Sequence, residues 1–376
     1  MKKKIVAVLL TMVMAVSLAA CGGNSSDDSG NETTDKSTDE ADGGSADTSD
    51  LHFEIVSKGF QHQYWQAVLK GAENKAEELG VSINFVGPNS ESDIADQVQM
   101  LNNAINAKPD AIGLAALDTS ACLDAIQGSM DADIPIIGFD SGVPDAPEGS
   151  VLANCATDNY AAGELAGDEM YKLISDRIDG SSDAVRIGVL AQDATSESIT
   201  QRGLGFIYKM IELLEADGKT VSVEGNDKYV ADSKGDKTDG ADVIMEVLVP
   251  AQVTSELSAI DCQTLLNKAD TIAIYGSNQH SGEAMVTANE NLKKFGTGGD
   301  QIVGVAFDSG EVIKGAVADG TFAGAVTQAP VAMGEALVQQ LYNAATGGTV
   351  EDVDTGCQWY SADNMDSEEI AQNLYD

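Results

Sequence analysis

The chain has 376 residues, a formal net charge of −40 at pH 7, and a hydrophobic content of 43%. This large negative charge repels nucleic-acid phosphates and anionic lipid headgroups. It therefore argues against nucleic-acid binding. The hydrophobic content is that of a globular protein, and the charge identifies no ligand by itself.

The first 21 residues have the layout of an export signal. Three lysines at positions 2–4 precede an uncharged, mostly apolar run over 5–20, and small residues lead into Cys21. A run of about 16 residues is short for a retained membrane anchor, so we expect residues 1–20 to be a cleaved signal peptide. The small residues before a lone cysteine resemble the lipobox of bacterial lipoproteins. That resemblance implies that Cys21 becomes a lipidated N-terminus, anchored to the membrane outside the cytoplasm.

Residues 21–50 are polar, with nine acidic residues against Lys36. Such a segment buries too little apolar surface to offset the entropy of ordering it. We predict a disordered acidic tether. No metal-ligand spacing recurs in it.

From residue 51, strand-like and helix-like patterns alternate. Strand patterns are predicted over 52–57, 81–85, 111–114 and 134–139, and helix patterns over 64–79 and 94–105. Trp65, Val68 and Ala72 lie on one face of the first helix, and Gly80 ends it. This βαβα order predicts a parallel sheet with helices on both faces.

The alternation starts again near residue 185. Strand patterns are predicted over 185–190, 220–223, 271–275, 301–307 and 322–327, with helix patterns over 199–214 and 311–318. About a dozen strands suit two sheets better than one. We therefore predict an α/β protein with two doubly wound, Rossmann-like parallel-sheet domains.

No spacing in the chain identifies a metal site. In the polar loop 232–242 the acids fall at i, i+4, i+7 and i+10, unlike a calcium loop, so a solvated insertion is favoured over a cation site. Cys122, Cys155, Cys262 and Cys357 form no CxxC pair, and the sequence leaves both two disulfides and free thiols open.

Candidate ligand contacts follow the predicted strands, because ligands of open α/β sheets bind beyond the carboxyl ends of the strands. These positions carry carboxylates, amides, hydroxyls and aromatic rings: Gln61, His62, Tyr64, Trp65, Asp140, Ser141, Asn278, Asp308 and Gln328. Carboxylates accept hydroxyl protons, amides donate and accept, and aromatic rings cover sugar faces. The set suits a neutral polyhydroxylated ligand, and no phosphate-binding glycine motif follows a strand.

Each candidate also has a structural interpretation. Trp65 lies on an apolar helix face and can be a core residue, Asp140 and Asp308 can cap helices, and His62 can belong to a turn. A different functional class is a glycosidase that uses Asp140 and Asp308 as its carboxylate pair. That chemistry needs the two carboxyl groups about 5–10 Å apart, a separation that the sequence does not give.

Most of the chain from residue 51 onward resembles the ribose-type sugar-binding proteins of the periplasmic-binding-protein type I class. The resemblance rests on segments in the family's order: IVSKGFQHQYW (55–65) with Gly71-Ala72, IPIIGFD (134–140), TDNYAAG (157–163), QRGLGF (201–206), the positions of Asn278, Asp308 and Gln328, and the hinge-like 354–356 with 363–364. It implies that Arg202 and the position of Thr200 contact the ligand, and it matches Tyr229 to a stacking aromatic.

The resemblance implies two lobes joined by a three-segment hinge. We expect one lobe to comprise 51–157 with 329–355, and the other 158–328 with 356–376. It further implies a monomeric lipoprotein that captures a monosaccharide-like ligand between the lobes and delivers it to the permease of an ABC importer. No cofactor, metal or catalytic residue is implied.

Two departures weaken a ribose assignment. Ribose binders of this family carry arginine at the positions of Ser141 and Thr200. A nucleoside, a furanosyl signal or an amino-acid derivative is the alternative ligand, and presentation to a membrane sensor is the alternative to transport. A transcriptional repressor core shares the fold, but it would need a basic helix-turn-helix in place of the export signal.

Overall fold

The computed structural model describes residues 50–60, 62–233 and 238–376. The predicted signal peptide, Cys21 and nearly all of the predicted tether lie outside the described residues, as do Gln61 and residues 234–237 of the polar loop. The chain from Asp47 to Asp376 forms one compact unit.

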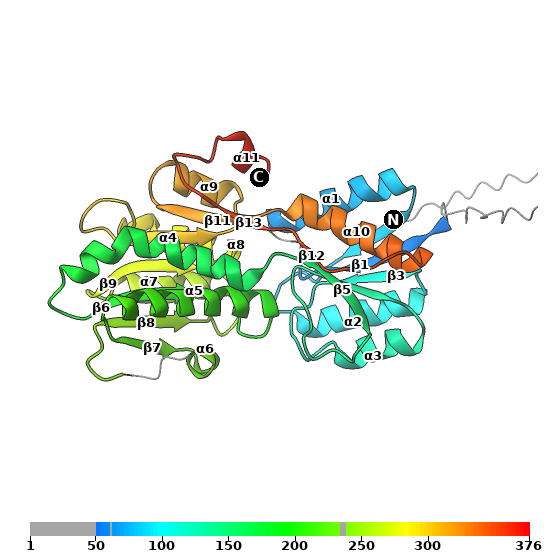
Figure 1. Ribbon diagram of the computed structural model, residues 1–376, viewed down its shortest axis with the longest axis horizontal. Helices are drawn as coiled ribbons and strands as arrows, with labels where there is room; N and C mark the ends of the chain where they lie inside the picture. Colours follow the sequence, from blue (N-terminus) through cyan, green and yellow to red (C-terminus); the bar gives the residue numbers. More distant parts are fainter. Residues whose placement is uncertain (1–49, 61, 234–237) are drawn as a thin grey trace, which may run out of the picture. The chain divides into compact units, whose positions relative to one another are not determined.

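The first sheet is parallel and six-stranded (Figure 1), in the order β12-β5-β4-β3-β1-β2. Its strands are β1 (His52–Val56), β2 (Ser82–Val86), β3 (Ala111–Leu114), β4 (Ile136–Phe139), β5 (Val151–Ala156) and β12 (Val353–Asp354). The accompanying helices are α1 (Gln63–Leu79), α2 (Ile94–Ala107), α3 (Leu123–Asp131) and α10 (Pro330–Thr346). We call this part the first lobe.

The second sheet has seven strands in the order β13-β11-β10-β9-β6-β8-β7. They are β6 (Val185–Leu190), β7 (Val221–Gly225), β8 (Val243–Leu248), β9 (Thr271–Gly276), β10 (Val303–Phe307), β11 (Gly324–Gln328) and β13 (Cys357–Tyr360). Its helices are α4 (Asn159–Asp179), α5 (Glu197–Ala216), α6 (Asp227–Asp232), α7 (Ser255–Leu266), α8 (Gln279–Leu292), α9 (Glu311–Ala318) and α11 (Glu368–Ala371). We call this part the second lobe.

The predicted fold class is confirmed, with two differences in the second lobe. Strand β13 pairs antiparallel with β11, because the chain enters the second sheet where β11 ends: Cys357, the first residue of β13, lies opposite Gln328, the last residue of β11. The polar loop joins edge strand β7 to β8, which lies between β7 and β6.

The chain passes between the sheets in three places: after β5, after β11 and after β12. The exact lobe bounds expected from the sequence stay a prediction. Helix α10 follows β11 of the second sheet, yet its Met333 and Leu337 pack into the core of the first lobe with Ile55 and Trp65.

The central strands of both sheets are buried on both faces. All residues of β3, β4, β6, β9, β10 and β11 are buried, as expected for parallel strands that are covered by helices on both sides. Separate apolar clusters lie around Ile55 and around Ile126 in the first lobe, and around Phe206 and around Leu265 in the second.

Glycines bring one pair of helices into close contact in each lobe. A Cβ atom on Gly71 of α1 would lie 1.9 Å from the carbonyl oxygen of Val331, at the start of α10. A Cβ on Gly205 of α5 would lie 2.1 Å from the carbonyl oxygen of Tyr160 in α4. Neither site has room for a side chain without a backbone shift.

The four cysteines of the described part are free thiols. Burial, with a smaller effect of nearby carboxylates, raises the pKa of Cys122 to about 11 and that of Cys155 to about 12. Within the described residues, no group of three or more histidine, cysteine or acidic side chains could hold a metal ion. None of the helices described there is long and apolar enough to cross a bilayer.

Candidate functional site

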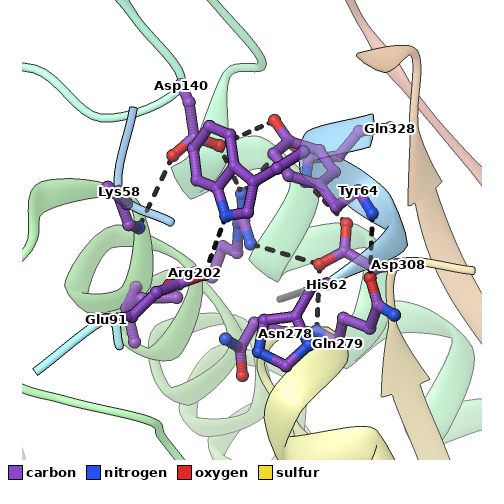
Figure 2. A pocket seen from close by; sticks show the side chains of 12 residues that line it. Lys58, His62, Tyr64, Glu91, Asp140, Arg202, Asn278, Gln279, Asp308 and Gln328 are labelled. Carbon is purple, nitrogen blue, oxygen red and sulfur yellow. Dashed lines mark hydrogen bonds and ion pairs between the residues drawn. The ribbon is translucent and has the colours of Figure 1, made fainter. Parts of the chain in front are cut away.

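A narrow cavity lies where the carboxyl ends of strands from both sheets meet (Figure 2). Its wall is mostly polar and charged, with two aromatic residues. The lining residues are Lys58, His62, Tyr64, Trp65, Glu91, Asp140, Ile199, Arg202, Asn278, Gln279, Asp308 and Gln328.

Two aspartates take equivalent positions in the two lobes. Asp140 follows β4 and Asp308 follows β10, and each is the second residue of a Phe-Asp-Ser-Gly sequence. Both have a left-handed backbone, with φ of 56° and 73°, and both side chains are buried. A non-glycine residue held in this region costs about 1–3 kcal/mol, and such strain concentrates at functional sites. Neither aspartate is the N-cap residue of a helix that follows it: the N-cap of α9 is Gly310, and the element after Asp140 is strand β5.

Asp140 presents a buried acceptor to the cavity. Its Oδ1 accepts a hydrogen bond of 2.7 Å from the Tyr64 hydroxyl. Its Oδ2 makes no hydrogen bond and lies 3.5 Å from Nζ of the buried Lys58. Buried acceptors are almost always satisfied, so Oδ2 of Asp140 lacks the hydrogen bond that its burial normally requires.

Arg202 of α5 links the two aspartates. It lies 4.2 Å over the Phe307 ring, with Nη1 3.8 Å from Asp308 Oδ2 and Nη2 3.9 Å from Asp140 Oδ1. Its Nε donates to Oδ1 of Asn159 at 2.7 Å. Burial alone would lower the pKa of Arg202, but the two carboxylates outweigh it and raise that pKa above its ordinary value.

Asp308 is held by two donors. Nε2 of Gln328 donates to Oδ1 at 2.6 Å, and the backbone N–H of Gln279 donates to Oδ2 at 3.0 Å. Burial raises the pKa of Asp308, and the Arg202 charge offsets part of this rise.

Trp65 belongs to the core and to the cavity wall. Its ring contacts Phe139 edge-on at 6.2 Å and Tyr64 at 5.0 Å, and it is 2% exposed. Its indole N–H donates to Oε1 of Glu91 at 2.7 Å. Trp65 is therefore a core residue that also lines the cavity.

The structure describes all the predicted contact residues except Gln61; of these eleven, eight line the cavity and three do not. The Ser141 hydroxyl accepts from the backbone N–H of Ser198, and the Thr200 hydroxyl donates to backbone carbonyls of its own helix. The Tyr229 hydroxyl donates to the carbonyl of Ile199, and its ring packs on Gly203. All three side chains are used within the protein, so we do not carry them further as ligand contacts.

Sequence reasoning missed Lys58, Glu91, Ile199 and Gln279. Lys58 and Glu91 follow β1 and β2, and the strand-end rule could have found both, because they lie at the same sheet edge as Asp140. Ile199 and Gln279 lie in the first turns of α5 and α8, where no motif singled them out.

His280 packs beside His62, which lines the cavity, and gives a pH prediction. Its Nε2 lies 2.8 Å from the Ser258 hydroxyl, and its ring lies 5.7 Å from that of His62. Burial, reinforced by His62, lowers the pKa of His280 from 6.5 to about 4. The unfolded chain then binds a proton more readily than the folded protein. The free energy of unfolding is therefore unaffected by His280 above pH 6.5 and decreases as the pH falls toward 4.

We expect His280 to cost the folded state up to about 3 kcal/mol between these pH values. Urea unfolding at several pH values should show that His280→Gln flattens the loss of stability as the pH falls. An identical slope in His280→Gln and the parent protein would contradict the prediction.

Residues 53–349 match the family model described as "Periplasmic binding protein domain". The chain belongs to this family. A Brachyspira murdochii structure, described as an ABC transporter, LacI family transcriptional regulator, has a TM-score of 0.73 and 33% identity, and the match covers 87% of this chain and 99% of that one.

The descriptions of two further relatives name a sugar. An Agrobacterium vitis ABC transporter solute-binding protein with bound D-fucose has a TM-score of 0.70 and 28% identity, over 86% of this chain and 100% of that one. The fructose import binding protein FruE of Bifidobacterium longum (strain NCC 2705) is 25% identical over 245 residues, which cover 61% of this chain and 68% of FruE.

Membership of this family makes the chain an extracytoplasmic solute-binding protein and not an enzyme. The expected resemblance to sugar-binding proteins of the type I class is thereby confirmed. The glycosidase alternative for Asp140 and Asp308 is not carried further.

Proposed function

We propose that the chain captures one monosaccharide-like molecule in the cavity between its lobes and delivers it to the permease of an ABC importer. The observation that carries this proposal is the buried Oδ2 of Asp140, which makes no hydrogen bond although it is ion-paired with Lys58, beside Arg202 and the ring of Tyr64. An acceptor, two cationic donors and aromatic surface are what a ring with adjacent hydroxyls needs.

The relatives support a sugar in this position. FruE is by name a fructose import binding protein, and the Agrobacterium vitis relative holds D-fucose. The proposed contacts in this chain are His62, Tyr64, Trp65, Asp140, Arg202, Asn278, Asp308 and Gln328, joined by Lys58, Glu91 and Gln279.

Calorimetry and thermal shift with a defined panel test the ligand. The panel contains D-fructose, D-fucose, D-ribose and D-arabinose, with adenosine and an amino-acid mixture as competing classes. A ligand at 100 times its Kd stabilises the folded state by about 2.7 kcal/mol, which raises Tm measurably. We expect a sugar to bind and to raise Tm. If only adenosine or an amino acid bound, the sugar proposal would be wrong, and the ligand would belong to that other class.

We also propose that Cys21 carries a lipid and that the acidic segment tethers a monomeric binding protein close to its membrane partner, which raises its effective concentration there. Expressed in a bacterial host, the parent protein should fractionate with membranes and incorporate labelled palmitate. Cys21→Ser should abolish the label and release the protein. A Cys21→Ser variant that keeps the label would contradict lipidation at this residue.

A further inference from the structure

One row of hydrogen bonds joins the cavity walls of the two lobes through Glu91, which lies after β2 in the first lobe. The indole N–H of Trp65 donates to Glu91 Oε1 at 2.7 Å, and Nε2 of Gln192 donates to Glu91 Oε2 at 2.9 Å. Gln192 follows β6 in the second lobe, and its Oε1 accepts a hydrogen bond of 2.7 Å from Nδ2 of Asn278. We call Trp65, Glu91, Gln192 and Asn278 the Glu91 relay.

The direction of the relay is determined at its Asn278 end. Asn278 caps α8: its Oδ1 accepts the backbone N–H of Ser281 at 3.0 Å. Its Nδ2 must therefore face Gln192, whose Oε1 accepts and whose Nε2 is left to donate. Trp65 has only a donor. Position 91 thus faces two donors from opposite lobes, and a carboxylate is the side chain that accepts from both.

The carboxylate of Glu91 stays charged in this environment. Burial would raise its pKa, yet the charges of Lys58 and His62 and the hydrogen bonds from Gln192 and Trp65 together lower that pKa below its ordinary value. Hydrogen bonds to a charged acceptor are about twice as strong as neutral ones.

We propose that Glu91 is a positioning residue that couples the two lobes: it accepts from Trp65 in one wall and from Gln192 in the other, so that closure of the lobes and placement of Trp65 and Asn278 occur together. This inference rests on the proposed function. It adds the contact that links Trp65, in the cavity wall of the first lobe, to Asn278, in the cavity wall of the second.

The variant Glu91→Gln distinguishes this hydrogen-bonding role from a packing role, because the side chains of glutamate and glutamine have nearly the same size and shape. An amide offers one acceptor atom and one donor atom, so it cannot accept from both Trp65 and Gln192. Adding Gln192→Glu restores the match. The new amide at position 91 then accepts from Trp65 and donates to the new carboxylate at position 192, and that carboxylate also accepts from Asn278.

In this double variant the negative charge moves from one lobe to the other and every hydrogen bond of the relay is kept. Nε2 of Gln192 also lies 3.4 Å from Asp193 Oδ2. A carboxylate at position 192 would face that neighbouring carboxylate, so we expect the rescue to be partial.

The readout uses Trp65 itself. The chain has two tryptophans, so Trp359→Phe leaves Trp65 as the sole indole reporter. Acrylamide quenching of this reporter measures access to the interlobe cavity, and it needs no ligand. The matched control is Glu283→Gln, which removes another carboxylate at the same gap, 3.8 Å from His62 Nδ1, outside the relay.

In the Trp359→Phe background without sugar, we expect Glu91→Gln to raise the quenching constant of Trp65 at least twofold, and Gln192→Glu added to it to reverse most of that rise. The Glu283→Gln control should change it little. For D-fructose or D-fucose, whichever the parent protein binds, Glu91→Gln should weaken affinity about tenfold to a hundredfold, and the double variant should recover part of it.

Equal quenching in the parent and Glu91→Gln proteins would overturn the coupling role, as would a double variant no better than Glu91→Gln alone. If no sugar binds the parent protein while the quenching pattern follows expectation, the coupling role stands and the sugar proposal fails. The two results are therefore separable.

Discussion

Asp140→Asn is expected to weaken sugar affinity at least a hundredfold, which corresponds to about 3 kcal/mol. The amide has the shape of the carboxylate, but it turns one of two acceptor atoms into a donor. Around Asp140 lie the Tyr64 hydroxyl, the Lys58 ammonium and the Arg202 guanidinium, all donors, together with the ligand hydroxyls we propose. Calorimetry with the sugar that binds the parent protein measures the loss.

Asp145→Asn is the matched control, because Asp145 is exposed in the turn after β4 and lines no part of the cavity. It should bind sugar as the parent protein does. If Asp140→Asn kept a Kd within about threefold of the parent value, the ligand would have to bind elsewhere. A lower Tm of Asp140→Asn without ligand is expected as well, since Lys58 and Arg202 lose a buried counter-charge.

Gly205→Ala is expected to destabilise the protein by about 3 kcal/mol or more, which corresponds to a drop in Tm of about 4 °C or more. The added Cβ would lie 2.1 Å from the Tyr160 carbonyl oxygen, so helices α4 and α5 must separate. Arg202 lies on the same stretch of α5, and its carbonyl oxygen would be 2.2 Å from a Cβ on Gly163. Separation of the helices therefore displaces a cavity residue, and sugar affinity should fall together with stability.

Gly128→Ala provides a control of opposite sign. A Cβ on Gly128, inside α3, meets nothing within 4 Å, so the alanine lowers the entropy of the unfolded chain without a clash. We expect a gain of about 0.5–1 kcal/mol. Thermal and urea unfolding measure both variants. A Gly205→Ala protein as stable as Gly128→Ala would show that the helix contact is not tight.

Sequence patterns predicted nine of the strands that the structure describes and missed β5, β8, β12 and β13. Strands β4 and β10 are buried on both faces, and their sequences are continuous apolar runs. Strand β5 contains Asn154 and alternates in burial, and β12 is two residues long, so neither carries a strong local signal. Their positions depend on pairing with strands far away in the chain.

The sequence by itself determined the α/β class, the two-sheet organisation and the strand ends where Asp140, Asn278 and Asp308 lie. Local hydrophobic patterns indicate both buried strands and the βαβ order of elements. Only the tertiary structure decided which of these side chains share a wall. Thr200 and Tyr229 have suitable chemistry, yet their hydroxyls are used by nearby backbone carbonyls. Lys58 and Glu91 carried no motif, yet sheet order places β1 and β2 beside β3 and β4 and brings both side chains to the cavity. Contacts between residues 26 to 215 positions apart, such as those of Trp65 with Glu91 and of Tyr64 with Gln279, depend on chain topology, which no local spacing encodes.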